Sequence, residues 1–587
     1  MPVEDHSRKI RLTKYLNLNR IDHTNMNNIS STLTNWTEIF SGWIAMPLTI
    51  ILIGTGIFVT ISLGFIQIKR LRHSFEVVLG RYDDPDDEGD VTHFQALSAA
   101  LSATIGIGNI AGVALAVRIG GPGALFWMWI TALFGMALKY AECTLSHRYR
   151  VIHDDGSASG GPMYYIEKGL GAKWKPLAIF FATCAVICSF CTGNMNQANT
   201  IGQAFANHHE LSLNKYKVDS LDIDHHFYRD IYNTDNGFLL FRSNHTITQS
   251  ELDTLKKDSV TSLTELNTNK IIGSTLFEAL TINNNNNILF AKDHTITEND
   301  IPYLLKNNYD SVSIKKLGLP EWISGLIIAT LVGLVIIGGI KRIAALASKL
   351  VPTMAALYVS GAIIILLTHL ENIIPSISSI FREAFSLEAG WGGLITVIMW
   401  GVRRGLYSNE AGQGSAPIAH AAAKTKESAR EGAVALMGPF IDTIVVCTMT
   451  GLAILSTGVL ESTDLTGAQL TREAFRNGFS FAPDIGSIIV NIAILLFAYT
   501  TMVAWSYYGD RSIEYLVGPK AIKPYRWVYV FFNFLGAILP LAFVWNFGDI
   551  ALSLMTIPNL IGVIFLTGSL KKITSDYFNR IHIPYKS

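Results

Sequence analysis

Charged residues are scarce in this chain. Asp, Glu, Lys and Arg make up 16% of its 587 residues, whereas a soluble globular protein carries about 25%. The hydrophobic share is 49%, and the mean hydropathy is +0.32. A chain of this composition needs a second solvent, and a bilayer core about 30 Å thick accepts helices of about 20 apolar residues. The composition therefore predicts a protein whose surroundings include a lipid bilayer.

Other absences exclude further classes. Lys plus Arg and Asp plus Glu are equal at 46 each, so the charge gives no reason to expect a nucleic-acid partner. Five cysteines do not make a disulfide framework in a chain of this length. The first 40 or so residues are polar and basic, and no apolar stretch lies close enough to the start to be a cleaved signal. Neither a G-x-S-x-G nor an HExxH motif is present, which argues against a membrane-embedded hydrolase.

Apolar stretches with few or no charges recur along the chain. They lie at 45–66, 94–117, 122–138, 176–206, 322–340, 350–368, 389–402 with its continuation 411–423, 432–460, 485–509, 527–545 and 550–570. Counting the interrupted pair near residue 400 as one, the pattern predicts about eleven transmembrane helices in an all-α polytopic membrane protein.

Short basic loops predict the orientation. Loops that follow the first, fifth and seventh stretches, and the segment after the last one, carry Lys and Arg and fall on one common side. The positive-inside rule makes that side cytoplasmic, in a multi-pass protein of the cell inner (plasma) membrane. The expected divisions are a polar N-terminal tail (1–40), an extra helix with the first part of repeat one (41–206), an insertion (207–318), the rest of repeat one (319–370), repeat two (371–570) and a cytoplasmic tail (571–587).

The insertion at 207–318 is polar and is expected outside the cytoplasm. It contains the run Asn283 to Asn287, and short stretches such as Thr246-Ile247-Thr248 alternate in polarity. Two alternatives remain open: a small β-rich or mixed cap, and a disordered insertion.

The second apolar stretch is interrupted by glycines. It reads Ser102-Ala-Thr-Ile-Gly-Ile-Gly-Asn109, which is a poor sequence for a continuous helix. Unwound backbone at this depth is tolerated only where it is buried or lines a cavity, and its N–H and C=O groups can then bind a carboxylate or a cation. The alternative is a glycine face that packs closely against another helix.

A second segment has the same order of residues. Ser408-Asn-Glu-Ala-Gly-Gln-Gly-Ser415 also places a serine four positions before a glycine, then a second glycine and a small polar residue. Each segment precedes an alanine-rich half-helix and opens a block of about five crossings, so the second block is inverted. Paired, glycine-interrupted helices at corresponding positions indicate a transporter site. Ser408 and Asn409 are therefore candidate substrate contacts.

Other polar groups within the apolar stretches are candidate contacts. The hydroxyls of Thr500 and Thr501 either bond back to their own helix or supply oxygen ligands to a cation. Stretch 176–206 carries a cluster of amides that would be costly against lipid, and Gln197 is the one that we expect to contact the substrate. Three cysteines in this stretch have helical spacing, for which packing is a better explanation than a metal site.

The charged residues near membrane depth are Lys139, Glu142, Arg403, Arg404, Glu410 and Asp442. Such residues are rare in membranes and usually paired or functional. Lys139 and Glu142 are close enough on one helix to neutralise each other. Arg403, Arg404 and Glu410 flank the second break, where pairing would latch a gate. Asp442 lies within its stretch, which favours a role in the pathway or in helix pairing.

The run Gly120-Gly-Pro-Gly-Ala-Leu-Phe-Trp-Met-Trp-Ile-Thr-Ala-Leu-Phe-Gly135 resembles the signature of the alanine or glycine:cation symporter family at all its positions. Segments 104–112, 193–199, 408–417 and 505–509 resemble other motifs of that family. The likeness covers about 40–206 and 319–570. It departs from the family at the insertion, which is longer than we expect at this external loop.

The resemblance implies a leucine-transporter-type fold, with a 5+5 inverted repeat preceded by one extra helix. It implies that Thr104, Gly106 and Gly108 hold the carboxylate of a small amino acid, alanine or glycine. By analogy with the fold, a sodium ion would be bound by the carbonyls of Ser102 and Ile105 with Thr500 and Thr501. By the same analogy, Asn109 would contribute to a second sodium site or contact the substrate. Trp400 would close the pocket for the side chain of the substrate.

Sodium-coupled uptake of a small neutral amino acid by alternating access is thus the expected function. The first break contains no carboxylate, which favours sodium bound by neutral oxygens, whereas Glu410 and Asp442 keep proton coupling open. A non-transporting amino-acid sensor is a further alternative, against which no recognisable cytoplasmic signalling module follows Leu570.

Overall fold

The computed structural model divides the chain into two units, which are described separately. It describes residues 37, 44 and 46–585, apart from gaps at 155, 206–207, 213, 219–225, 228, 235–237, 244, 259, 267–270, 273, 277–279, 283–286, 292–293, 307–310, 316–318, 388–389, 464 and 540–541. The larger unit comprises residues 1–201, 325–459 and 465–587, and the smaller one comprises 202–324 and 460–464.

The larger unit is helical, apart from the short hairpin β1 (Val151–Ile152) and β2 (Ala158–Ser159). Before the insertion its helices are Met46–Ser62, α2 (Ile66–Lys69), α3 (Leu71–Val78), α4 (His93–Thr104), η1 (Gly108–Gly112), α5 (Val113–Gly120), α6 (Ala124–Arg148), α7 (Pro162–Leu170), η2 (Ala172–Trp174), α8 (Lys175–Phe190), η3 (Cys191–Met195) and α9 (Asn196–Phe205). After the insertion they are α13 (Glu321–Ile336), α14 (Gly339–Thr368), α15 (Leu370–Glu383), α16 (Gly390–Asn409), α17 (Ala416–His420), α18 (Ser428–Ala435), α19 (Met437–Pro439), η6 (Phe440–Cys447), α20 (Thr448–Ser456), α22 (Gly467–Gly478), α23 (Pro483–Val517), η7 (Pro519–Ala521), α24 (Ile522–Ile538), α25 (Ala542–Phe565) and α26 (Thr567–Phe578). The short helix α21 (Val459–Ser462) belongs to the smaller unit from Leu460 onward.

Many of these helices are long and apolar enough to cross a membrane. Within the described residues, six helices pass on length and hydropathy: 124–148, 172–205, 339–368, 428–456, 483–517 and 547–565. The bent pair α4 and α5 makes a seventh span, and Met46–Ser62 and α13 are shorter apolar helices. The chain is therefore a polytopic membrane protein. The count of eleven crossings and the inverted repeat stay predictions.

Some helix limits differ from those that hydropathy predicts. The expected stretch 350–368 is the second part of α14, which begins at Gly339 and takes in the basic residues expected in a loop. Likewise, α23 extends to Val517, beyond the expected end at 509. The charges in its last turns are paired: Arg511 with Glu514 at 2.9 Å, and Asp510 with Arg526 at 2.5 Å. Because paired charges are tolerated in helix ends, a hydropathy limit placed at the first charge is too early.

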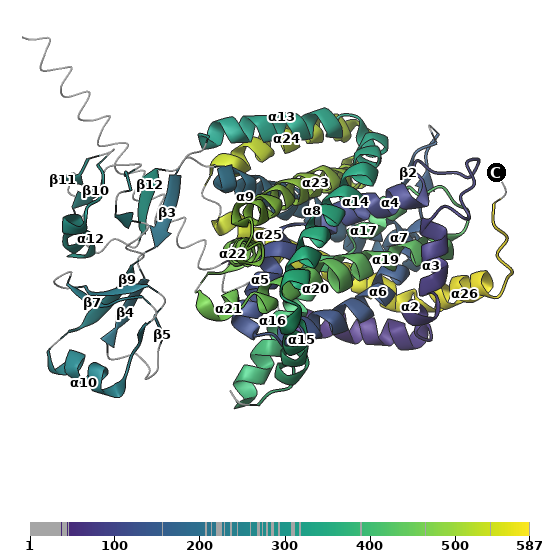
Figure 1. Ribbon diagram of the computed structural model, residues 1–587. Helices are drawn as coiled ribbons and strands as arrows, with labels where there is room; N and C mark the ends of the chain where they lie inside the picture. Colours follow the sequence, from purple (N-terminus) through teal and green to yellow (C-terminus); the bar gives the residue numbers. More distant parts are fainter. Residues whose placement is uncertain are drawn as a thin grey trace, which may run out of the picture. The chain divides into compact units, whose positions relative to one another are not determined.

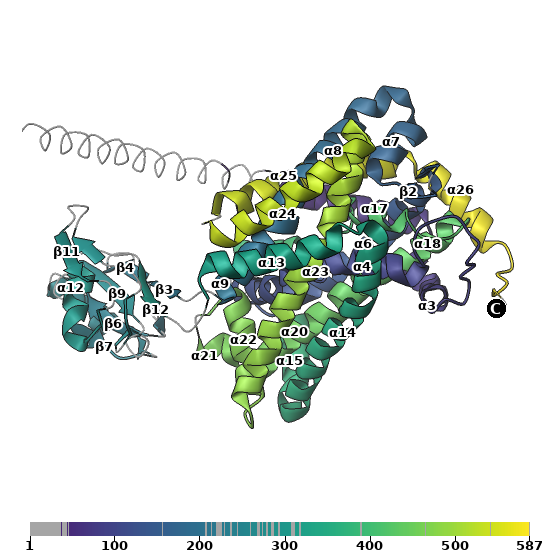
Figure 2. The same ribbon diagram turned by 90° about the horizontal axis from the view of Figure 1, so that it is seen from above.

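Small residues allow the helices near the site to approach closely. A Cβ added at Gly401 of α16 would lie 2.4 Å from the carbonyl oxygen of Ala124, at the start of α6, and one at Gly405 would lie 3.1 Å from Cβ of Thr131. Only glycine fits at such a contact, as in the small-residue faces of membrane helices. In Figures 1 and 2, α13 and α24 also lie side by side, and a Cβ added at Gly325 of α13 would lie 3.0 Å from Ala537 of α24.

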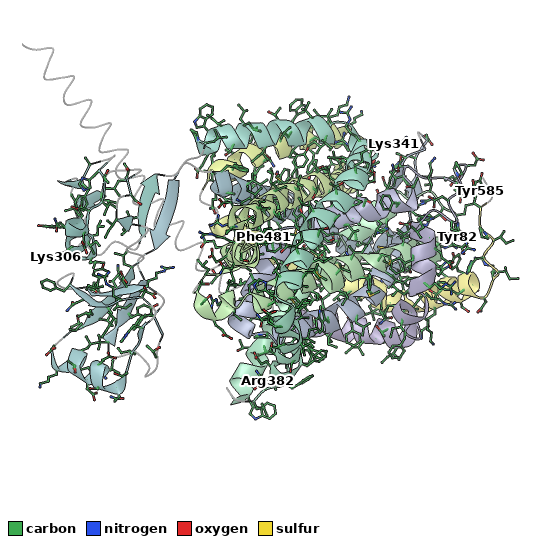
Figure 3. The ribbon with its side chains drawn as sticks, viewed as in Figure 1. Tyr82, Lys306, Lys341, Arg382, Phe481 and Tyr585 are labelled. Atoms are coloured by element: carbon green, nitrogen blue, oxygen red, sulfur yellow. The ribbon has the colours of Figure 1, made fainter. Side chains whose placement is uncertain are left out.

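A buried polar cluster joins the ends of three helices near the basic loops. Glu431 of α18 accepts hydrogen bonds from His93, at the start of α4, and from His420, at the end of α17 (2.5 Å). All three side chains are at most 1% exposed. Nearby, His73 of α3 bonds Tyr577 of α26 through Nε2 at 2.8 Å. Figure 3 shows Tyr82 and Tyr585 at this same end of the helical unit.

The smaller unit is rich in strands. Its antiparallel sheet has the order β4 (Asn214–Lys217), β9 (Ser262–Leu266), β6 (Asp230–Asn233) and β7 (Leu239–Phe241). β3 (His208–Ser212) pairs with β12 (Ser311–Lys315), which brings the two ends of the insertion together. The remaining elements are β5 (His226–Phe227) with β8 (His245–Thr246), β10 (Leu280–Ile282) with β11 (Asn287–Phe290), α10 (Gln249–Lys257), η5 (Glu298–Asp300) and α12 (Ile301–Lys306). Of the two alternatives for the insertion, the structure contains the β-rich one. Its location outside the cytoplasm stays a prediction.

Candidate functional site

The first glycine-interrupted segment is a true break. α4 ends at Thr104, Ile105 has an extended backbone (φ −72°, ψ 91°), and the two half-helices are bent by 55°. The amide of Gly106 donates to Oδ1 of Asn109 at 2.9 Å, so a side chain replaces a helix carbonyl as its acceptor. Asn109 is fully buried in η1, a turn of π-helix, and π-helical turns recur at functional sites. The break is thus held open by its own side chain.

The second glycine-containing segment, at residues 408–415, is also a break between two helices. α16 ends at Asn409 and α17 begins at Ala416, with Glu410 (φ 51°), Gly412 (φ 78°) and Gly414 (φ 84°) in left-handed conformations between them. Glycine adopts these angles at no steric cost, and a Cβ on Gly412 or Gly414 would also lie 2.6 Å from a neighbouring side chain. The amide of Ala411 donates to Oδ1 of Asn409 at 3.0 Å. Here too an asparagine caps the unwound backbone.

A polar junction connects the two breaks. The carboxylate of Asp442, in π-helix η6, accepts from Asn109 Nδ2 at 2.6 Å, from Ser408 Oγ at 2.8 Å and from Thr443 Oγ1 at 2.8 Å. Asn109 Nδ2 also lies 3.1 Å from Ser408 Oγ. These four side chains, the Asp442 junction, are at most 3% exposed. Charge-assisted hydrogen bonds are stronger than neutral ones, so the junction fixes the two breaks against each other.

A small cavity of about 30 Å³ lies beside this junction. It is lined by Ala103, Thr104, Gly106, Ile107, Gly108, Thr192, Gln197, Tyr407, Ser408, Glu410, Thr501, Trp505 and Leu552. Both breaks therefore contribute to one cavity, together with residues of η3, α9, α23 and α25. We call it the central cavity.

Two polar atoms of the cavity wall have no hydrogen-bond partner among the described residues. They are Oγ1 of Thr192 and Oε1 of Gln197, whose side chains are 6% and 7% exposed. The amide nitrogen of Gln197 donates to the carbonyl oxygen of Thr192 at 3.2 Å, which fixes the orientation of the side chain. Buried polar groups are nearly always partnered. These two oxygens are thus suited to accept hydrogen bonds from a polar ligand.

The two adjacent threonines of α23 face different neighbours. Both hydroxyls donate to the carbonyl oxygen of Phe497, at 3.1 Å for Thr500 and 2.8 Å for Thr501. Oγ1 of Thr501 also lies 3.5 Å from the carbonyl oxygen of Ala103 at the first break, whereas Oγ1 of Thr500 lies 3.6 Å from the sulfur of Met354. Two oxygens held about 2.4 Å from a hard cation and at right angles lie about 3.4 Å apart. The Thr501 and Ala103 oxygens have that separation.

The model of the sodium:alanine symporter family matches residues 30–220 and 287–584. The chain belongs to the sodium:alanine symporter family. The Sodium/alanine symporter AgcS of Methanococcus maripaludis is 38% identical over 538 residues, which are 91% of this chain and 94% of that protein. From Bacillus subtilis, the Putative sodium/proton-dependent alanine carrier protein YrbD is 30% identical (90% and 89% covered), and the Probable sodium/glutamine symporter GlnT is 28% identical (90% and 87% covered).

Membership of the sodium:alanine symporter family makes the chain a membrane transporter.

The structure brings many of the predicted site residues together. Those that line the central cavity are Thr104, Gly106, Gly108, Gln197, Ser408, Glu410 and Thr501. Asn109 and Asp442 meet in the junction next to it. Ser102, Ile105 and Asn409 belong to the breaks but are not among the lining residues, and Thr500 points elsewhere. Their roles in binding stay predictions.

Two of the predicted gate and pocket residues, Trp400 and Arg403, are not among the residues that line the central cavity, whereas Glu410 is. Trp400 packs near Gly120, and the guanidinium of Arg404 lies 5.3 Å from its ring. In the described part of the chain neither Arg403 nor Arg404 forms an ion pair with Glu410, whose Oε2 accepts from Ser415 at 2.5 Å. Lys139 and Glu142 do pair, at 3.9 Å.

The tryptophan that does line the cavity is Trp505, which the sequence reasoning did not select. It is 1% exposed and packs on Gly193, where an added Cβ would lie 2.3 Å from the indole ring. Both residues lie in segments that resemble motifs of the family, which was the available signal. Thr192, Tyr407 and Leu552 were also missed, because each is one of many similar residues in an apolar helix.

Proposed function

We propose that this protein takes up a small neutral amino acid, alanine or glycine, together with sodium ions across the plasma membrane. The observation that carries the proposal is the meeting of two broken helices at one small, partly polar cavity. Broken helices at corresponding positions of two repeats are how many transporters build a substrate site. The relative named as a sodium/alanine symporter, with 94% of its length covered, supports the same assignment.

In this proposal the unwound segment between Thr104 and Gly108 receives the substrate carboxylate. The unpartnered oxygens of Thr192 and Gln197 accept from the ammonium group. Tyr407, Trp505 and Leu552 enclose the side chain. A wall of large side chains discriminates by size, and the small volume of the cavity favours a methyl group or a hydrogen over a longer side chain.

Sodium is proposed to bind between the first break and α23, with the oxygens of Thr501 and Ala103 among its ligands. Because the ion and the amino acid then share one flexible segment, each raises the affinity for the other, and the coupling is reciprocal. Alternating access follows if α4 and α16 move relative to the rest while the site stays near the middle of the membrane. Import is then driven by the sodium gradient.

The two threonines offer a matched test. Thr501→Ala should raise the sodium concentration for half-maximal alanine uptake by about tenfold, which corresponds to ~1.4 kcal/mol of lost ion binding. Thr500→Ala removes an equally buried hydroxyl with the same Phe497 acceptor, so it controls for packing and should change the value little. If both variants needed the same sodium concentration for half-maximal uptake, Thr501 would not be a ligand of the sodium ion.

Proton coupling is the second candidate, because two carboxylates lie at the site. Glu410 lines the central cavity, and Asp442 lies in the junction; the two are 6% and 0% exposed. A carboxylate buried at this depth is a candidate proton carrier. Uptake that follows a proton gradient without sodium, and that is lost in Glu410→Gln, would favour this candidate.

A further inference from the structure

A second cavity lies next to the central one, and nothing described so far uses it. Its volume is about 70 Å³, more than twice that of the central cavity. It is lined by residues of the helix Met46–Ser62, of α16 and the second break, and of α25. Tyr407 and Leu552 line both cavities. The two spaces are thus separated by a wall of side chains, and we call the larger one the outer cavity.

The outer cavity carries one charge of each sign. Arg403 of α16 and Asp549 of α25 both line it. The guanidinium groups of Arg403 and Arg404 interact with the charge of Asp549 at a distance, yet in the described part of the chain Arg403 and Asp549 form no ion pair within 4.0 Å. Oδ1 of Asp549 is buried and has no hydrogen-bond partner among the described residues. Ionisable groups within membrane helices are costly unless they are paired, and by default they mark a functional site. Arg403 and Asp549 thus carry opposite charges and line the same cavity without contacting each other. A ligand that carries both charges fits between them.

A third polar group faces the same space. Gln413, which lies between the glycines of the second break, is 5% exposed and lines the outer cavity. Its amide nitrogen donates to the carbonyl oxygen of Leu406 at 3.1 Å, which fixes the side chain, while Oε1 has no partner among the described residues. A buried carbonyl oxygen without a donor is a ready acceptor. The break that helps to build the central cavity therefore presents an acceptor to the outer one as well.

This donor and acceptor set selects the chemistry of the ligand. The guanidinium of Arg403 suits a carboxylate, which it can bind through two parallel hydrogen bonds. The carboxylate of Asp549 and Oε1 of Gln413 suit an ammonium group. A simple anion would leave Asp549 unpaired, and a simple cation would face Arg403, so neither satisfies both charges. Leu48, Leu52 and Leu406 form the apolar part of the wall, which suits a small aliphatic side chain.

We propose that the outer cavity binds a second zwitterionic amino acid of the same kind as the substrate, with its carboxylate on Arg403 and its ammonium on Asp549. The inference rests on the proposed function, because it takes the ligand from the transported class. Each chain then holds two amino acids at saturation, one on either side of the wall made by Tyr407 and Leu552. Because Gln413 belongs to the second break, occupancy of the outer cavity bears directly on the segment that closes the central one.

The test is equilibrium binding of radiolabelled alanine to the purified full-length protein in sodium. Two molecules per chain are expected for the wild type. Asp549→Asn should retain one, in the central cavity, and Gly108→Leu should retain one, in the outer cavity, because its side chain extends toward Tyr407 and Ser408. Asp484→Asn changes an exposed carboxylate on α23 and is the matched control, with two expected.

Two further arms keep the inference separate from folding and from the proposed function. Leu48→Trp fills the outer cavity without removing a charge, and it should also reduce binding to one alanine per chain. One alanine per wild-type chain, or two in both Asp549→Asn and Leu48→Trp, would overturn the inference. If the wild type accumulates alanine in proteoliposomes while either result holds, only the outer site fails. If it neither accumulates nor binds alanine, the proposed function fails with it.

Discussion

Ser408 is the residue through which the two broken helices are coupled most directly. Its hydroxyl donates to Asp442 at 2.8 Å and lies 3.1 Å from the amide nitrogen of Asn109. Ser408→Ala removes both contacts and leaves almost no space behind. A hydrogen bond to a charged group contributes about 1.5–3 kcal/mol. Because the junction holds the two breaks together beside the central cavity, the lost free energy should destabilise the closed state of the transporter.

In the proposed mechanism substrate binding is linked to that closure, so the lost free energy should appear in the apparent affinity. The KM for alanine uptake should rise about 10- to 150-fold, since every 1.4 kcal/mol is a factor of ten. Initial rates in proteoliposomes measure it, with Thr396→Val as control, because that hydroxyl on the same helix bonds only its own backbone, at 2.9 Å from the oxygen of Gly392. A lower thermal stability with an unchanged KM would refute the reasoning, because it would mean that the junction is equally strong in every state.

Three further variants test other parts of the structure. Gly193→Ala places a Cβ 2.3 Å from the ring of Trp505, so it should lower the free energy of unfolding by about 1–3 kcal/mol and reduce alanine uptake. Gly438→Ala is the control, because a Cβ there has nothing within 4 Å, and it should change neither. Thermal melts and uptake assays of both variants measure the two effects. Glu431→Gln weakens the buried cluster with two histidines and should lower the free energy of unfolding by about 3–5 kcal/mol. Glu427→Gln, which removes the charge of an exposed ion pair, should lower it far less. Equal melting temperatures of the two variants would contradict a stabilising role for the cluster. Burial and the neighbouring His582 lower the pKa of His73 from 6.5 to about 4. The folded state then binds fewer protons than the unfolded one, so the free energy of unfolding should fall as pH falls from 6.5 to 4. His73→Phe should reduce that fall, which melting temperatures measured across this pH range report. An unchanged pH profile would exclude His73 as the source of the pH dependence.

The breaks were the most predictable part of the structure. Glycines at spacing two, next to small polar residues, disfavour a helix locally, and the chain does leave the helix at Thr104 and at Asn409. That an asparagine side chain would cap each break was not predictable. The caps depend on where Asn109 and Asn409 point once the helices are packed.

The orientation of neighbouring side chains was the least predictable part. Thr500 and Thr501 are adjacent in sequence, and successive residues of a helix differ by about 100° in direction, so which one faces the break depends on how α23 packs. The same holds for Trp505 and Trp400, since only packing decides which tryptophan lines the cavity. Hydropathy also misplaced the end of α23, because it treats a paired charge in a helix as a loop residue, and it misplaced the start of α14, whose first turn carries Lys341 and Arg342.

The central claim is that the cavity between the two breaks couples a small amino acid to sodium. Its most direct test is uptake of radiolabelled alanine into proteoliposomes, with an inward sodium gradient in one arm and only an inward proton gradient in the other. We expect accumulation above equilibrium in the sodium arm alone. No accumulation with sodium, or full accumulation on the proton gradient alone, would contradict it.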